Sequence, residues 1–219
     1  MKIPEFYKKQ KHTFSFEFFP PKTDEAEAKL FETARELQPL KPSFISVTYG
    51  AMGTTRSNTL RIVGKIKKEI GIEAAAHLTC VGQTRDEIET VLGELQKNGV
   101  ENIVALRGDP PKGETEFKPV PNGFRYASEL VSYIRKHPKF SQAFSLAVAG
   151  YPETHMECRD KIKDLAHLQS VTFESMKQFT GEGNPYPLYN RYIVYKRMKT
   201  LVLPSEITLF PFIDRKSVV

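Results

Sequence analysis

The chain has 219 residues, of which 40% are hydrophobic and 26% charged, a composition typical of a globular protein with a substantial core. Its net charge is +6, but the basic residues are dispersed through predicted helices, which argues against a nucleic-acid-binding surface. No apolar run is long enough to span a bilayer, no signal-peptide core is visible, and two cysteines do not make a disulfide framework. We therefore expect a cytoplasmic protein that binds neither membranes nor nucleic acids.

The first predicted strand carries a carboxylate among aromatic side chains. Residues 1–13 form a short basic lead-in, and Phe14–Phe19 then alternates weakly and stops at two prolines, which is typical of a strand. If Glu17 points into an apolar interior, its charged form is disfavoured and it becomes a candidate general acid. The alternative is an outward-facing residue on an edge strand. The pattern leaves both interpretations open.

The next elements alternate between helix and strand. The spacing Asp24-x-x-Glu27 is a helix start of the capping-box type, with Asp24 in the capping position, and Phe44–Tyr49 is the following strand, with a threonine and a tyrosine at its end. Ser57 is suited to cap the next helix, and Gly71 is suited to end it. This order of elements is typical of an α/β protein.

The third strand, Ala74–Thr79, has small residues suited to a tightly packed interior and a histidine, His77, near its end. That histidine is either a ligand group or a buried histidine with a polar partner, and the second is the commoner case. Thr84 begins a full capping box, which predicts a helix that ends at Gly99.

The fourth strand is the apolar, β-branched run Ile103–Leu106, which meets the charged residues Arg107, Gly108 and Asp109, and two prolines prevent its continuation. In an alternating β/α chain this polar tip lies at the carboxyl edge of a parallel sheet, where ligands bind. A turn with a surface ion pair is the plainer interpretation. Because several other predicted strands also end in polar side chains, we favour a ligand site at this edge.

The fifth unit follows a long polar connection, Lys112–Arg125, which is a candidate lid. A helix over Tyr126–His137 and a strand over Phe144–Tyr151 come next, before a polar helix that ends near Leu168. Five strand-helix units predict a parallel sheet with covering helices. Since no glycine-rich dinucleotide fingerprint follows the first strand, a (β/α)8 barrel is favoured over an open doubly wound sheet, although a full barrel needs about 250 residues.

The last segment, 169–219, departs from the alternation, and only Tyr189–Tyr195 and Ile207–Ile213 have strand-like composition. We expect two domains: a partial TIM barrel over 1–168, truncated to about five βα units, and an atypical tail over 169–219. An open barrel leaves strand edges and apolar helix faces uncovered, which predicts aggregation or a homo-oligomer.

Two His-x-x-Cys pairs, His77 with Cys80 and His155 with Cys158, offer the ligand types of a zinc site. Each pair follows a different strand, whereas structural zinc draws its ligands from short knuckles, so a metal site is disfavoured. The strand ends combine an acid, aromatic side chains and an Arg-Asp pair, which suits a flat heterocycle with polar edges.

Six motifs resemble those of methylenetetrahydrofolate reductases, in the family's order and at its spacing, over about residues 13–168. They are SFEFFPPKT (15–23), FISVTYGA (44–51), AAHLTC (75–80), NIVALRGDPP (102–111), YASELV (126–131) and AGYPETH (149–155). The resemblance implies a (β/α)8 barrel that holds FAD at the carboxyl ends of its strands. It also implies that NADH or NADPH reduces the flavin, which then reduces 5,10-methylenetetrahydrofolate to 5-methyltetrahydrofolate, in the one-carbon metabolism that supplies methionine.

The resemblance also implies roles for particular residues. Glu17 would be the general acid that helps to open the imidazolidine ring of the folate, and Asp109 would lie between flavin and folate. Thr48 would lie near the nicotinamide. The residues that would bind the flavin are Tyr49, Ala51, His77, Arg107, Gly108, Asp109, Tyr126, Ala127, Ala149, Tyr151, His155, Asp164 and His167, the last in place of the family's asparagine.

After Leu168 the sequence departs from the family. The basic pair, the Val-Asp-Ala-Gly-Ala turn and the glutamine that holds folate are missing, and Ser170 and Val171 stand in place of the basic pair. A truncated or frame-disrupted gene is our hypothesis for this difference. The expected function is FAD-dependent methylenetetrahydrofolate reduction, and the alternative is a non-catalytic partial barrel that binds flavin weakly or not at all. A phosphate-binding aldolase would need a lysine at a strand end, and we find none.

Overall fold

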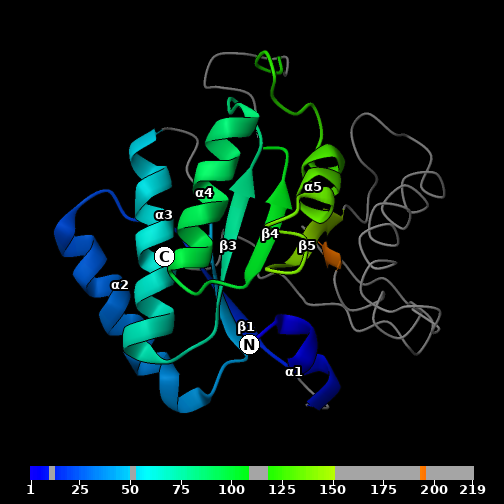
Figure 1. The fold of residues 1–219 in the computed structure, drawn as a ribbon. Helices are drawn as coiled ribbons and strands as arrows, with labels where there is room; N and C mark the ends of the chain where they lie inside the picture. The colour runs from blue at the N-terminus through cyan, green and yellow to red at the C-terminus, as the bar shows by residue number, and fades with distance from the viewer. Residues whose placement is uncertain (10–12, 50–52, 109–117, 151–192, 196–219) are drawn as a thin grey trace. The chain divides into compact units, whose positions relative to one another are not determined.

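A computed structural model describes residues 1–9, 13–49, 53–108, 118–150 and 193–195 of the chain (Figure 1). The chain forms two compact units, Met1–Leu146 and Ala147–Val219. The predicted domain boundary after residue 168 falls outside the described residues and stays a prediction.

The strands are parallel, as the sequence predicts. The first unit contains β1 (Ser15–Phe18), β2 (Phe44–Val47), β3 (Ala74–Thr79) and β4 (Asn102–Leu106), each paired in parallel with the next along the chain. β5 (Ser145–Gly150) begins in this unit, where the N–H of Ser145 donates to the carbonyl of Glu101 at 2.7 Å. In the second unit β5 pairs in parallel with β6 (Ile193–Tyr195), which lies within the predicted strand Tyr189–Tyr195.

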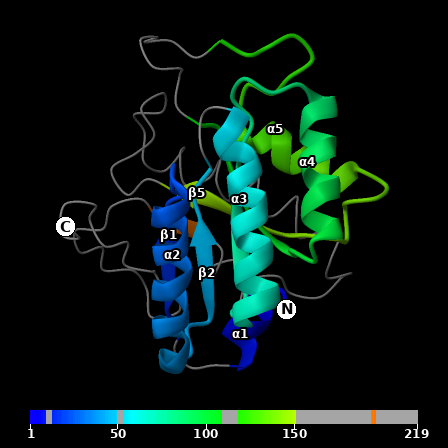
Figure 2. The same cartoon turned by 90° about the vertical axis from the view of Figure 1, so that its left-hand side faces the viewer.

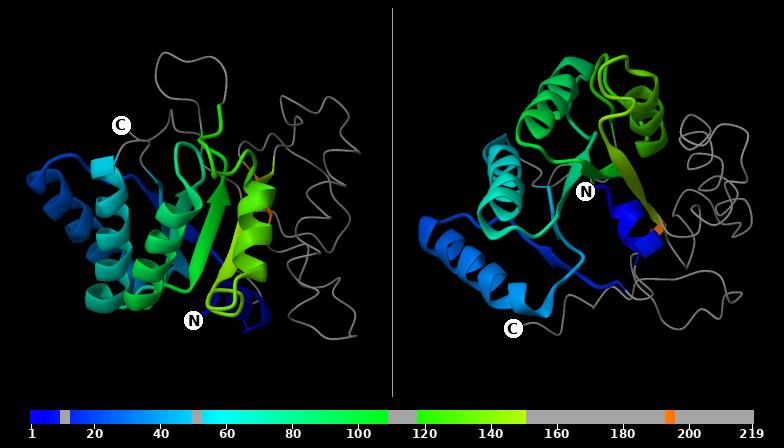
Figure 3. Two further views of the ribbon diagram at one scale, coloured as in Figure 1. Left: turned by 45° about the horizontal axis from the view of Figure 1, so that its top comes forward. Right: turned by 60° about the horizontal axis from the view of Figure 1, so that its bottom comes forward.

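Helices connect the strands of the first unit and lie on one side of them (Figure 2). The four helices between strands are α2 (Asp24–Leu37), α3 (Gly53–Lys65), α4 (Arg85–Lys97) and α5 (Ala127–Lys136). A 3-10 turn, η1 (Gln38–Leu40), extends α2, and a π-helical segment, η2 (Ile66–Ile70), extends α3. In the right-hand view of Figure 3 the four helices form an arc outside the strands, the arrangement of consecutive β/α units.

The two faces of these strands differ in polarity. Apolar side chains at alternate strand positions are at most 1% exposed beneath the helices: Ile45, Val47, Ala74, Ala76, Leu78, Ile103 and Ala105. Because successive side chains of a strand point to opposite faces, the remaining positions face away from the helices. Glu17 in β1, Ser46 in β2 and His77 in β3 occupy such positions. The inner face of the sheet therefore carries the polar groups.

Two helix ends match the capping predictions. Before α4, the hydroxyl of Thr84 accepts from the N–H of Glu87 at 3.3 Å, and the Glu87 carboxylate accepts from the N–H of Thr84 at 2.7 Å. This reciprocal pair is the predicted capping box. Gly71 ends η2 with a φ of 79°, a left-handed conformation that glycine adopts without steric cost.

Two helix starts differ from the predictions. α2 is capped by Thr23, whose hydroxyl accepts from the N–H of Ala26 at 3.2 Å, so that Asp24 is the first helical residue. There its carboxylate interacts favourably with the positive end of the helix dipole. Ser57 does not cap α3, because that helix already begins at Gly53.

The basic lead-in is also more ordered than the sequence predicts, since it contains the helix α1 (Ile3–Lys9). The side chains of Ile3 and Tyr7, one turn apart, are buried. α1 lies at the amino ends of the strands (Figure 1). There the N–H of Ile3 donates to Oδ1 of Asn102 at 2.7 Å. A helix this short depends on such tertiary contacts, so its own sequence does not reveal it.

Asn102, the first residue of β4, fastens α1 to the sheet. It is 1% exposed, and its Nδ2 donates to the carbonyl of Met1 at 3.1 Å and to Glu73 Oε1 at 3.2 Å. We expect Asn102→Leu to lower the free energy of unfolding by about 3 kcal/mol, because the buried N–H of Ile3 loses its acceptor. In a domain of this size that corresponds to a fall in Tm of about 6–12 °C.

Asn98→Ala is the matched control, measured with Asn102→Leu by thermal unfolding in circular dichroism. Asn98 also makes two side-chain hydrogen bonds, to Lys68 and to the Glu94 carbonyl, but both are exposed to solvent. Its replacement should cost about 1 kcal/mol or less. Equal losses of Tm in the two variants would contradict the role assigned to Asn102.

Candidate active site

Polar residues follow β2, β3 and β4 at the same edge, because parallel strands present their carboxyl ends together. After β2, the Tyr49 hydroxyl donates to Gln83 Oε1 at 3.4 Å. Gln83, which is fully buried, donates from Nε2 to the carbonyl of Thr79 at 2.5 Å. The N–H of Val81 donates to the carbonyl of Arg107 at 2.9 Å. These bonds join the three strand ends into one supported edge.

Two predicted site residues from different strands are brought together on the inner face. His77 Nε2 in β3 lies 3.3 Å from Glu17 Oε2 in β1, and the two side chains are 10% and 18% exposed. Glu17 therefore faces the interior with a nitrogen partner, which decides between the two orientations that the sequence left open. His77 is a buried histidine with a polar partner, and that partner is itself a candidate catalytic group.

Thr48 and Tyr49 are half-buried at the end of β2. The Thr48 carbonyl accepts from the hydroxyl of Thr59, a fully buried residue of α3, at 2.9 Å. This bond fixes the backbone from which both predicted ligand-binding side chains project.

Gly108 adopts a conformation that favours glycine at the end of β4. Its φ is +89°, and a Cβ built on it would lie 2.4 Å from Val81 Cγ1 and 3.1 Å from Thr79 Cβ. A side chain there would therefore meet both a strained backbone and the neighbouring strand end. Only glycine allows Arg107 and the backbone after it to lie this close to β3.

The other predicted site residues are distributed as follows. Tyr126 is the N-cap of α5 and Ala127 its first residue. Ala149 lies in β5 of the second unit, where it pairs with Val194. Those that lie outside the described residues are Ala51, Asp109, Tyr151, His155, Asp164 and His167. The site assignments for these residues stay predictions.

The described part of the predicted lid, 118–125, is held against α4. The N–H of Arg85 donates to the carbonyl of Asn122 at 3.0 Å, and Thr84 and Gly123 form an isolated antiparallel bridge. The Arg85 guanidinium lies 5.2 Å from the ring centroid of Phe124, which is 1% exposed. This half is fastened to the helix layer, and residues 112–117 lie outside the described residues.

Two residues of the site were not predicted. Ser46 lies opposite Glu17 in the register of β1 and β2 and is 6% exposed, and Gln83 links the ends of β2 and β3. Ser46 is a polar residue within an apolar strand, which is a signal that could have found it. Gln83 looks like an ordinary loop residue before a capping box, and its sequence gives no such signal.

Cys80 is buried rather than available as a ligand. It is 1% exposed, its Sγ lies 3.7 Å from the carbonyl oxygen of Arg107, and burial raises the pKa of its thiol to about 11. In the part of the chain that the structure describes, no three His, Cys, Asp or Glu side chains are grouped to hold a metal. His155 and Cys158 of the disfavoured zinc site lie outside the described residues.

We expect the Cys80 thiol to resist iodoacetamide at pH 8 in the folded protein. With a pKa of about 11, about one thiol in a thousand is ionised at that pH, and the thiolate is the reactive form. Peptide mass spectrometry after native and denaturing alkylation measures this. Similar labelling of Cys80 in both conditions would contradict its burial.

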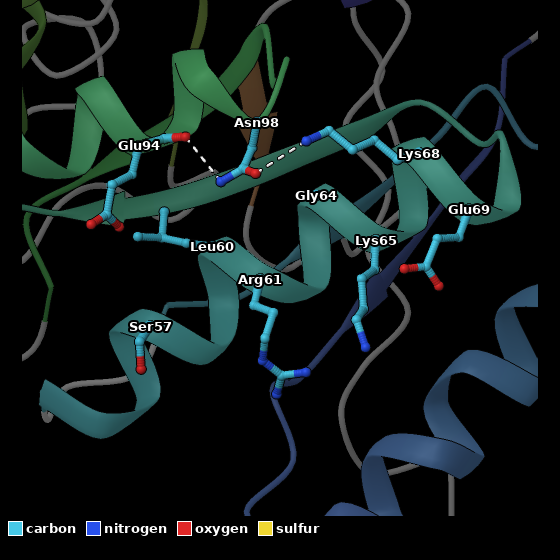
Figure 4. Close-up of a pocket in the computed structure, with 9 residues that line it drawn as sticks. All are labelled: Ser57, Leu60, Arg61, Gly64, Lys65, Lys68, Glu69, Glu94 and Asn98. Carbon is cyan, nitrogen blue, oxygen red and sulfur yellow. Dashed lines mark hydrogen bonds between the residues drawn. The ribbon is translucent and has the colours of Figure 1, made fainter.

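A hollow of about 330 Å³ on the helix layer, between α3 and α4, is a different feature (Figure 4). Lys68 Nζ donates to Asn98 Oδ1 at 3.2 Å, and Asn98 Nδ2 donates to the carbonyl of Glu94 at 3.0 Å. Arg61 forms a bidentate ion pair with Glu27 of α2. Three polar side chains of this hollow, those of Arg61, Lys68 and Asn98, thus already have hydrogen-bond or ion-pair partners. The predicted site residues that the structure describes do not line it.

The arrangement defines an α/β protein of the TIM-barrel type, with parallel strands, covering helices and polar residues at the carboxyl edge. The family model for methylenetetrahydrofolate reductase matches residues 2–172, and the chain belongs to this family. The 5,10-methylenetetrahydrofolate reductase of Escherichia coli is 44% identical over 155 residues, which are 71% of this chain and 49% of that protein. Methylenetetrahydrofolate reductase (NADH) 1 of Arabidopsis thaliana is 43% identical over 142 residues, 65% of this chain and 24% of that protein.

The chain thus spans about half the length of the bacterial relative and about a quarter of the plant one. Among solved structures, a muconate cycloisomerase from Azorhizobium caulinodans aligns with a TM-score of 0.42 and 14% identity, over 84% of this chain and 38% of that one. That likeness is too slight to bear on fold or function. Among the described residues, no helix has the length and apolarity needed to cross a membrane.

Proposed function

We propose that this chain carries the active-site half of an FAD-dependent methylenetetrahydrofolate reductase, with NADH or NADPH as the electron donor. The observation that carries the proposal is the pair formed by Glu17 and His77, 3.3 Å apart on the inner face of the sheet. A largely buried carboxyl with a nitrogen partner, close to the ligand-binding edge, is suited to general acid catalysis. Membership of the family supports the reaction class.

The residues at the strand ends fit a flavin. Thr48, Tyr49 and Arg107 offer hydroxyl and guanidinium groups that can hydrogen bond the polar edge of an isoalloxazine ring. Gly108, where a side chain would meet Val81 and Thr79, lets the backbone that follows Arg107 lie close to the end of β3. When bound, FAD supplies the transfer of hydride from the nicotinamide nucleotide to the folate.

In this proposal the chain's own residues bind, orient and move a proton. The Glu17 carboxyl holds the proton that opens the imidazolidine ring of the folate. Tyr49, Arg107 and Gly108 bind the flavin, and Thr48 lies near the nicotinamide. The wider setting is one-carbon metabolism and methionine supply in the cytoplasm. We expect a homo-oligomer, since an open partial barrel would leave strand edges uncovered.

The test is the visible absorption spectrum of the purified chain, reconstituted with FAD and then titrated anaerobically with NADH and, separately, NADPH. We expect a protein-bound flavin spectrum that bleaches with one or both nucleotides and recovers on addition of 5,10-methylenetetrahydrofolate. The nucleotide that bleaches it identifies the donor.

A chain that stays colourless after reconstitution would overturn the proposal. It would favour the alternative, a non-catalytic partial barrel that is related to the reductases by descent but lacks their activity. A flavin that bleaches but is not reoxidised by the folate would limit the function to the nicotinamide half of the reaction.

A further inference from the structure

Glu17 and His77 are the ionisable side chains of strands β1–β4. The four strands read SFEF, FISV, AAAHLT and NIVAL, and the remaining side chains in them are apolar or neutral. The nearest ionisable residues beyond the carboxyl ends of β3 and β4 are Cys80 and Arg107, and Glu73 precedes β3 at the opposite end. Two ionisable groups in these buried strands are costly unless they are paired.

The register explains why they lie on one face. Glu17 pairs with Ser46, and Ser46 pairs with Ala75. His77 is two residues beyond Ala75, so its side chain lies on the same face and one step nearer the ligand-binding edge.

The pair has to bridge a whole strand, because β2 lies between β1 and β3. Two strand spacings amount to about 9–10 Å, yet Nε2 of His77 and Oε2 of Glu17 are 3.3 Å apart. The two side chains therefore meet above β2, between the level of Ser46 and the level two residues further along. A serine there is small enough to leave room, whereas a leucine would occupy the space in which they meet.

We infer that His77 is a positioning residue for the carboxyl of Glu17, and that Ser46 is the spacer that lets the two side chains meet across β2. The positioning role is additional to the flavin contact that the family resemblance implies for His77. Its importance for catalysis rests on the proposed function. A carboxyl held through one oxygen by an imidazole keeps one orientation, which is what a proton donor to a bound substrate requires. In the free chain the pair holds one proton at the inner face, on an imidazolium that the Glu17 carboxylate stabilises, and the carboxylate takes up that proton before it acts as the acid toward the folate.

The inference is tested by the titration of His77 in the full chain without added cofactor. The measurement is the imidazole NMR signal of His77 against pH, assigned by its loss in His77→Gln. In Glu17→Gln we expect the pKa of His77 to fall by about one unit or more, because the opposite charge that favours the imidazolium is gone.

Two substitutions at position 46 separate the pairing from burial. Ser46→Ala keeps the space open and should leave the pKa of His77 unchanged. Ser46→Leu should lower it as Glu17→Gln does, but should lower it little further when combined with Glu17→Gln, because the two changes remove the same interaction.

A His77 pKa that is the same in the unaltered chain and in Glu17→Gln would overturn the inference. So would additive effects of Ser46→Leu and Glu17→Gln, which would mean that the leucine acts through burial alone. These results do not depend on flavin, so a colourless protein would contradict the proposed function and leave the test of the pairing intact. In a flavin-loaded protein, Ser46→Leu should slow folate reduction about 10-fold or more with nicotinamide oxidation retained, the signature of lost positioning.

Discussion

Replacing Glu17 by glutamine is expected to slow the reduction of 5,10-methylenetetrahydrofolate by about 10²–10⁴-fold, the usual contribution of a general acid. Glutamine has nearly the same shape as glutamate and can still hydrogen bond His77 Nε2, which lies 3.3 Å from the Glu17 carboxylate. It has no acidic proton. The folded structure and the bound flavin should therefore be retained while proton transfer to the folate is lost.

The measurement separates the two half-reactions. Flavin reduction by NADH or NADPH, followed with an artificial electron acceptor, should be unchanged in Glu17→Gln, because no proton transfer to folate takes place in it. Glu32→Gln, at an exposed position of α2, is the control and should affect neither half-reaction. Loss of both half-reactions with flavin still bound would show that Glu17 does not act as the general acid.

The local part of the fold could be read from the sequence because it depends on residues close together in the chain. The capping box of Thr84 and Glu87 and the left-handed Gly71 need only a few neighbours, and both are present as predicted. The buried strands β3 and β4 were also predicted, since runs of small or β-branched residues between helical segments suit a parallel sheet. The family resemblance, carried by multi-residue motifs, is confirmed over residues 2–172.

The features of the fold and site that the sequence did not predict depend on contacts between residues far apart in the chain. α1 is stabilised through Asn102, about a hundred residues away, so its seven residues alone gave no helical signal. The meeting of Glu17 and His77 requires the register of three strands and a small residue between them. Sequence pattern could suggest that both lie near one edge of the sheet, but not that they touch.

Gly108→Ala is expected to have the second largest effect, on both stability and flavin binding. The left-handed backbone costs alanine about 1 kcal/mol, and the new methyl group would lie 2.4 Å from Val81 Cγ1. Relieving that overlap requires the strand ends of β3 and β4 to separate, at a cost of about 2 kcal/mol. We expect the free energy of unfolding to fall by about 3 kcal/mol in total. We also expect a lower affinity for the flavin, because Arg107 moves with the displaced backbone.

Two further variants separate these causes. Gly99→Ala is a matched control, because Gly99 also has a positive φ, +74°, but nothing lies within 4 Å of its would-be Cβ. It should lose about 1 kcal/mol, the backbone cost alone, with flavin binding unchanged. The clash is then tested by Gly108→Ala combined with Val81→Ala, which removes the atom that the new methyl meets.

The double variant should recover much of the flavin affinity that Gly108→Ala loses, although Val81→Ala by itself leaves a small cavity and costs some stability. Flavin fluorescence titration gives the affinity, and urea unfolding gives the stability. If the double variant binds flavin no better than Gly108→Ala, the positive φ of Gly108 is the cause instead. Gly99→Ala measures the same backbone cost at a glycine with no atom near its would-be Cβ. Comparison of Gly108→Ala, Gly99→Ala and the double variant therefore shows whether flavin affinity depends on the close approach of the ends of β3 and β4.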